Sequence, residues 1–152
     1  MLIDYHTHVN FAAFKDDADE VVKRAQEAGV FMVLIGSQID TSRRAVEMAA
    51  RYEKGVWAAV GLHPIHLENI QVDEEEDHFA TRAEVFDPAA YRALAQYGKV
   101  VAIGECGLDY YHLMDKPYTA RHSEQSPRTS PIQIGRCGVS LRAVKNPVNN
   151  ST

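Results

Sequence analysis

Cysteine is scarce in this chain, which has only Cys106 and Cys137, and neither belongs to a C-x-x-C pair. We therefore expect neither a disulfide framework nor a thiolate zinc site. A reducing, cytoplasmic setting is the simplest interpretation. Cys106 is expected to serve as a small buried hydrophobic residue rather than as a nucleophile.

The chain also lacks an excess of positive charge and any long hydrophobic run. Its net charge of -5 argues against binding duplex nucleic acid through a broad basic face, because that mode neutralises many phosphates with Lys and Arg. No segment approaches the roughly 20 apolar residues of a membrane span. Strand-like residues begin at Leu2, so no cleavable leader and no membrane partner are expected.

What the chain does have is a regular alternation of short apolar runs and amphipathic segments, within a length that suits one globular domain. Strands are predicted over four apolar runs, Met1–Tyr5, Val30–Ile35, Val56–Leu62 and Val100–Ile103. Since an amphipathic segment follows each of the first three, the order is βαβα. This order predicts an α/β fold with a parallel sheet, either open and doubly wound or closed into a barrel.

Three helices are predicted between these strands from their capping residues and apolar stripes. The first follows Asp16 and Asp17 and stops at Gly29, and the second covers about Asp40 to Lys54. In the third, Asp87 is the expected cap, Pro88 suits the first turn and Gly98 ends the pattern.

Two segments depart from the alternation. The stretch from His63 to Phe86 contains an acidic run at 73–77, which favours a solvated surface over a substrate-discriminating lid. The stretch from Ser126 to Thr152 has no Asp or Glu and no apolar period, which indicates a disordered or non-native tail. We therefore predict a folded domain over residues 1–125 and an irregular tail over residues 126–152.

Asp4, His6 and His8 alternate along the first predicted strand. Side chains two residues apart on a strand point to the same side, so the two imidazoles can converge on one metal ion. Asp4 could accept a hydrogen bond from a ring nitrogen that is not bound to metal and so fix its tautomer. For an isolated H-x-H pair, two histidines at a polar strand end are at least as good an explanation.

The ends of two other strands carry residues of the same chemical kind. Glu105 follows the fourth strand, and His63 follows the third. Parallel α/β folds place their active sites at the carboxyl ends of the strands, so these side chains are expected to meet His6 and His8 there. For His63 alone, an ordinary loop histidine and a phosphate contact are about equally good explanations.

Three segments in this order, LIDYHTH from Leu2, GLHP from Gly61 and IGECGLDYY from Ile103, resemble the successive motifs of the TatD family. The resemblance covers about residues 1–125 and implies a TIM-type (β/α) barrel that acts as a metal-dependent deoxyribonuclease on the ends of DNA. It implies divalent ions as cofactors, Mg, Mn or Zn, two of them in the complete site. The implied roles are metal ligands for His6, His8 and the catalytic Glu105, substrate binding for His63, and outer contacts for Asp4 and Asp109.

The family pattern continues with further strands that end in His, His and Asp, and the residues after Gln125 do not match them. The resemblance therefore implies about the first four βα units of the barrel and an impaired nuclease. Two alternatives remain open. One is a non-catalytic metal-binding remnant or interaction module, and the other is a different H-x-H phosphoesterase, which the GLHP and GECGLDYY segments disfavour.

Overall fold

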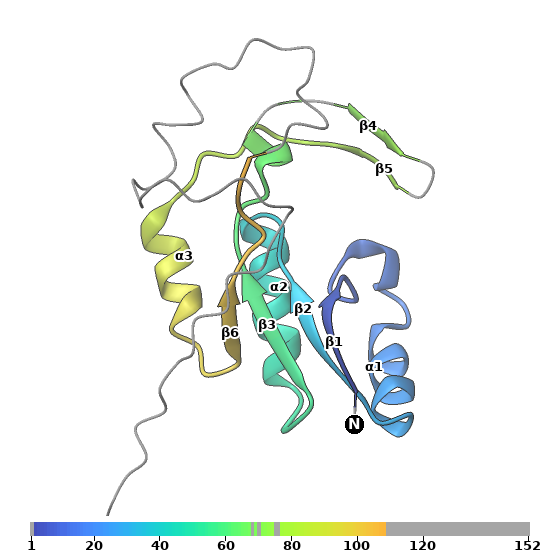
Figure 1. Ribbon diagram of the computed structural model, residues 1–152. Helices are drawn as coiled ribbons and strands as arrows, with labels where there is room; N and C mark the ends of the chain where they lie inside the picture. The colour runs from blue at the N-terminus through green and yellow to red at the C-terminus, as the bar shows by residue number, and fades with distance from the viewer. Residues whose placement is uncertain (1, 68, 70, 75–76, 109–152) are drawn as a thin grey trace, which may run out of the picture.

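The computed structural model describes residues 2–67, 69, 71–74 and 77–108, and within this part a four-stranded parallel sheet carries the fold (Figure 1). Neighbouring strands pair in the order β1-β2-β3-β6, and all three pairs are parallel. The strands are β1 (Leu2–Thr7), β2 (Val30–Ile35), β3 (Val56–Val60) and β6 (Val100–Ile103). The predicted apolar runs thus all form strands, with ends that differ by at most two residues.

Three helices connect these strands, α1 (Ala18–Glu27), α2 (Ile39–Ala50) and α3 (Pro88–Ala95). The predicted cap of α3 is confirmed, because the Asp87 carboxylate accepts hydrogen bonds from two backbone N–H groups of the first turn, at 2.9 and 3.2 Å. Helix α2 ends four residues before the predicted Lys54, and the chain then turns through Gly55, whose φ of +78° suits glycine.

The main core lies between the helices and one face of the sheet. It joins Val22 of α1 and Ala45, Val46 and Ala49 of α2 to alternate strand residues such as Leu34. A second cluster on the other face contains only strand residues, Val33, Ile35, Ala59 and Ala102, with Trp57 and Val101 packed against it. Both faces of the central strands are therefore buried, which explains why their sequences are continuously apolar.

The segment from His63 to Phe86 contains structure that the sequence did not predict. It begins with a short 3₁₀ helix, Pro64–Leu67, and continues into an antiparallel hairpin of β4 (Gln71–Glu74) and β5 (Asp77–Ala80). Figure 1 shows this hairpin extending beyond the carboxyl ends of the parallel strands. A second 3₁₀ helix, Ala12–Phe14, follows β1. The predicted tail over residues 126–152 lies outside the described residues.

Two glycines let the chain turn tightly at the carboxyl ends of β2 and β3. A Cβ on Gly36 would lie 2.3 Å from the Ser42 Oγ, and one on Gly61 would lie 2.4 Å from the Glu105 carbonyl oxygen. The Ser42 hydroxyl also hydrogen-bonds both backbone groups of Gly61 at 3.2 Å. Helix α2 is thereby fixed to the end of β3.

Among the described helices, none has the length and apolar character needed to cross a membrane.

Candidate metal site

His6, His8 and Glu105 form a compact cluster of potential metal ligands at the carboxyl end of the sheet. One ligand atom from each residue lies within 4.8 Å of those of the other two. The Nε2 of His6 lies 3.5 Å from Oε1 of Glu105, and the two imidazole rings are 4.9 Å apart and nearly perpendicular. The structure thus brings together the three residues that the sequence predicted as ligands.

The two histidines are positioned by the end of β1 and the loop that follows it. The pairing register with β2 shifts between Asp4 and Thr7, and the Thr7 hydroxyl donates to the Val33 carbonyl at 3.0 Å. The carboxylate of Asp4 accepts from the backbone N–H of His6 at 3.0 Å, so Asp4 helps to hold the backbone of the motif. The ring of Phe11 packs against the His8 ring at 4.4 Å.

Glu105 reaches the cluster because the chain after β6 stays attached to two neighbouring strand ends. The Gly104 N–H donates to the Val60 carbonyl at 3.0 Å, and the Glu105 N–H donates to the Gly36 carbonyl at 3.3 Å. The side chain of Glu105 is only 11% exposed, whereas that of His6 is 45% exposed. The Glu105 carboxylate is therefore more deeply buried in the cluster, and His6 lies nearer to solvent.

The geometry fits a divalent cation. Two ligands that each lie about 2 Å from one ion are separated by roughly 3 to 4 Å, and the His6–Glu105 separation of 3.5 Å falls in this range. Two imidazoles and a carboxylate suit zinc and similar first-row ions, and the carboxylate also suits magnesium or manganese. Three protein ligands leave coordination positions for water or a substrate oxygen.

Other predicted residues lie apart from this cluster or outside the described residues. His63 is not among the three clustered ligands, and its Nδ1 accepts from the Ile65 N–H at 3.1 Å. Asp109 lies outside the described residues. The expectation that Cys106 is buried is wrong, because the chain leaves the sheet after Ile103 and Cys106 is exposed.

Several buried polar residues near the cluster were not predicted from the sequence to have a role in the site. The Asn10 amide donates to the carbonyls of Ile35 and Thr41, both at 3.0 Å, and thereby fixes the loop after β1 to the start of α2. His66 is 5% exposed and its Nε2 lies 3.2 Å from the Ser37 Oγ. Burial, reinforced by the nearby His63, lowers the pKa of His66 to about 4, against the opposing effect of the Glu105 charge.

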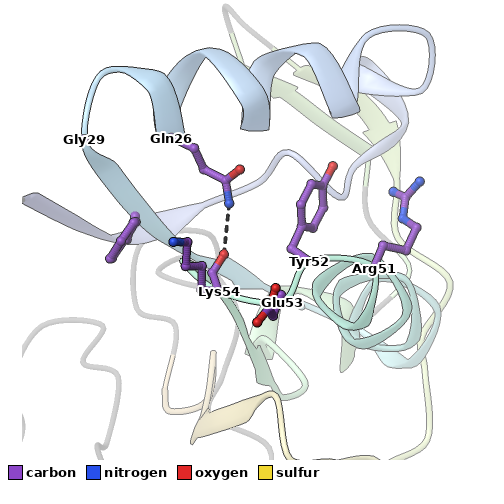
Figure 2. Close-up of a pocket in the computed structure, with 7 residues that line it drawn as sticks. Gln26, Gly29, Arg51, Tyr52, Glu53 and Lys54 are labelled. Atoms are coloured by element: carbon purple, nitrogen blue, oxygen red, sulfur yellow. Dashed lines mark hydrogen bonds between the residues drawn. The ribbon is translucent and has the colours of Figure 1, made fainter.

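A hollow of about 670 Å³ lies at the opposite, amino end of the sheet, between the ends of α1 and α2 (Figure 2). The Gln26 amide crosses it and donates to the Lys54 carbonyl at 2.9 Å. Tyr52 and Arg51 line it, and both are bound to Asp19. It is open to solvent and contains none of the three clustered ligands, so the carboxyl end remains the candidate site.

Comparison with known proteins shows the family to which the chain belongs. A family model described as TatD related DNase matches residues 3–126. The 3'-5' ssDNA/RNA exonuclease TatD of Cronobacter sakazakii is 34% identical over 80% of this chain and 41% of its own length. A Bacillus subtilis protein, the uncharacterized metal-dependent hydrolase YabD, is 38% identical over 93% of this chain and 46% of its own length.

The chain therefore spans less than half the length of these relatives. The family match includes the two segments that carry the clustered ligands and also the GLHP turn, which decides against another class of H-x-H phosphoesterase. The chain belongs to the family of TatD-related DNases.

Proposed function

We propose that this chain is part of a divalent-metal-dependent hydrolase that cleaves phosphodiester bonds at the ends of nucleic acid strands. The observation that carries the proposal is the convergence of His6, His8 and Glu105 at the carboxyl end of the sheet. The names of the relatives, an exonuclease on single-stranded DNA and RNA and a metal-dependent hydrolase, support the same class of reaction.

In this proposal, His6 and His8 would hold a divalent ion through neutral imidazole nitrogens, and Glu105 would share it through one carboxylate oxygen. A bound divalent ion lowers the pKa of a water ligand and neutralises charge on the phosphate oxygens. The second carboxylate oxygen of Glu105 is then available to accept the proton of the attacking water. His63, on the neighbouring loop, is the residue proposed to contact the phosphate.

The charge of the chain favours a short contact with a strand end. With a net charge of -5, the chain cannot supply the broad basic face that binding along a duplex requires. Positive charge confined to a metal centre attracts one or two phosphates, which is sufficient to hold a terminal nucleotide. We therefore propose single-stranded ends, rather than internal duplex sites, as the substrate.

The test is release of nucleotides from single-stranded DNA labelled at its 5' end, with magnesium or manganese present. We expect slow release that stops with EDTA and is lost in Glu105→Gln. Glu53→Gln, an exposed carboxylate at the amino-end hollow, is the matched control and should behave as the original chain. Release that is insensitive to EDTA or to Glu105→Gln would contradict the proposal.

The rate is expected to be low because the described cluster offers three ligands. Fixing two ions requires more, and loss of a second ion removes several kcal/mol of transition-state stabilisation, or on the order of a thousandfold in rate. A non-catalytic metal-binding module would have the same cluster of three ligands. Ion binding with no detectable release of nucleotides would select that alternative.

A further inference from the structure

The turn after β2 anchors two residues of the proposed site at once. The carbonyl of Gly36 accepts from the Glu105 N–H at 3.3 Å, and the next carbonyl, of Ser37, accepts from the His63 N–H at 2.7 Å. Two adjacent peptide groups therefore hold the proposed ligand carboxylate and the proposed phosphate contact. A shift of this turn would move Glu105 and His63 together, or would break one of the two contacts.

The turn is held on one side by the start of α2. The Thr41 hydroxyl accepts from the backbone N–H groups of Ser37 and Gln38, at 2.9 and 3.0 Å. On the same side, Gly36 lies so close to Ser42 that it has no room for a side chain. These contacts fix the turn to its own helix, but they do not set its position relative to the loop that carries His63.

A second contact across to that loop, beside the backbone bond between Ser37 and His63, is made by the side chains of Ser37 and His66, which hydrogen-bond at 3.2 Å. Both side chains are buried, at 7% and 5% exposure, and the backbone N–H of His66 donates to the His63 carbonyl at 3.0 Å. Because burial lowers the pKa of His66 to about 4, the ring is neutral at neutral pH and forms this hydrogen bond without a charge.

We propose that Ser37 and His66 are positioning residues of the metal site: their hydrogen bond fixes the turn after β2 against the His63 loop and so sets the placement of Glu105 and His63 relative to each other. The inference rests on the proposed function. Contacts that orient metal ligands from outside typically change metal affinity by about 10 to 100-fold when they are removed. The effect on Ser37 and His66 variants is expected in this range.

The experiment is a calorimetric titration of the full chain with manganese. Ser37→Ala removes one hydroxyl and is expected to weaken manganese binding about tenfold with unchanged stoichiometry. His66→Ala should have a similar effect, and His66→Gln, which keeps a hydrogen-bonding group, should recover part of the affinity.

Tyr52→Phe is the matched control, because its hydroxyl donates to Asp19 beside the amino-end hollow, away from the turn. It should lower stability without changing manganese affinity. Equal affinity in Ser37→Ala, His66→Ala and the original chain, with binding still lost in Glu105→Gln, would overturn the positioning role alone. Absence of manganese binding in the original chain would overturn the proposed function as well.

Discussion

The two ends of the parallel sheet differ in how their polar groups are arranged. At the carboxyl end, Asn10, Ser37 and His66 are buried and hydrogen-bonded across loops that are distant in the sequence. At the amino end, Arg51 and Asp19 form an exposed ion pair beside a solvent-open hollow. Buried networks constrain geometry closely, whereas exposed ion pairs contribute little to stability. The chain thus concentrates its precise polar contacts at the end that carries the proposed chemistry.

The largest expected difference between the two ends is in metal binding. Replacing His6 and His8 with Ala removes two of the three clustered ligands, so manganese affinity should fall by a hundredfold or more. Removing one residue that only orients a metal ligand already costs up to about a hundredfold in affinity. Replacing Gln26 and Arg51 with Ala at the amino end should leave affinity unchanged. Isothermal titration of both double variants measures the contrast, and an equal loss in the two would abolish it.

Alanine at two glycines provides a test of packing. A Cβ at Gly61 would lie 2.4 Å from a backbone oxygen, so Gly61→Ala should cost about 3 kcal/mol of unfolding free energy and displace Glu105. A Cβ at Gly98, at the amino end, meets nothing within 4 Å, so Gly98→Ala should change stability by no more than about 0.5 kcal/mol. Urea denaturation measures both values, and a tolerated Gly61→Ala would show that the carboxyl end is less rigid than described.

The pH dependence of stability separates the two ends further. The pKa of His66 is lowered to about 4, so the unfolded chain binds a proton between about pH 6.5 and 4 that the folded chain does not. Stability should therefore fall as the pH is lowered through this interval, by on the order of 2 kcal/mol from this group. Burial and the hydrogen bond to Asp19 raise the pKa of Tyr52, at the amino end, to about 12, so it does not titrate there.

Urea denaturation at several pH values, with His66→Gln as the control, isolates the contribution of His66. The variant should lose less stability on acidification than the original chain does. Identical pH profiles for the two proteins would show that the imidazole gains a proton in the folded state as readily as in the unfolded state.

The smallest effect is expected from the exposed ion pair at the amino end. Arg51→Ala breaks a contact of 3.0 Å whose side chains are 53% and 64% exposed, and it should cost less than about 1 kcal/mol. The cost should shrink further at high salt because exposed charges are screened. Thermal unfolding at low and high salt measures it, and a cost that exceeds that of Gly61→Ala would reverse the comparison.

Most of the fold could be predicted from the sequence because hydrophobic burial determines its pattern. The predicted fold class, part of a TIM-type barrel with parallel strands alternating with helices, is confirmed by the sheet and by the family match. The hairpin of β4 and β5 was missed because its strand residues, QVDE and DHFA, carry neither a continuous apolar run nor a clear alternation. The boundary between residues 1–125 and 126–152 stays a prediction.

The site was predictable where side chains depend on strand geometry alone. The H-x-H motif and Glu105 both follow from the rule that parallel strands end at one edge, and the structure brings them together. The supporting contacts could not be predicted, because Asn10 and His66 bind partners 25 to 31 residues away. The contact that the structure shows for Asp4 is with the backbone N–H of His6, and its role toward a ring nitrogen stays a prediction.

The strand order has a consequence for how the site forms during folding. Each strand of the parallel sheet pairs with the sheet strand that precedes it in the chain, so the sheet can grow in the direction of synthesis, one strand at a time. Within the described sheet, His6 lies in the first strand and His8 directly after it, whereas Glu105 follows the last strand. Because the three ligands meet only after β6 has paired, an ion that needs all three binds only the assembled sheet. Its binding energy then adds directly to the stability of that state and disfavours every intermediate before it.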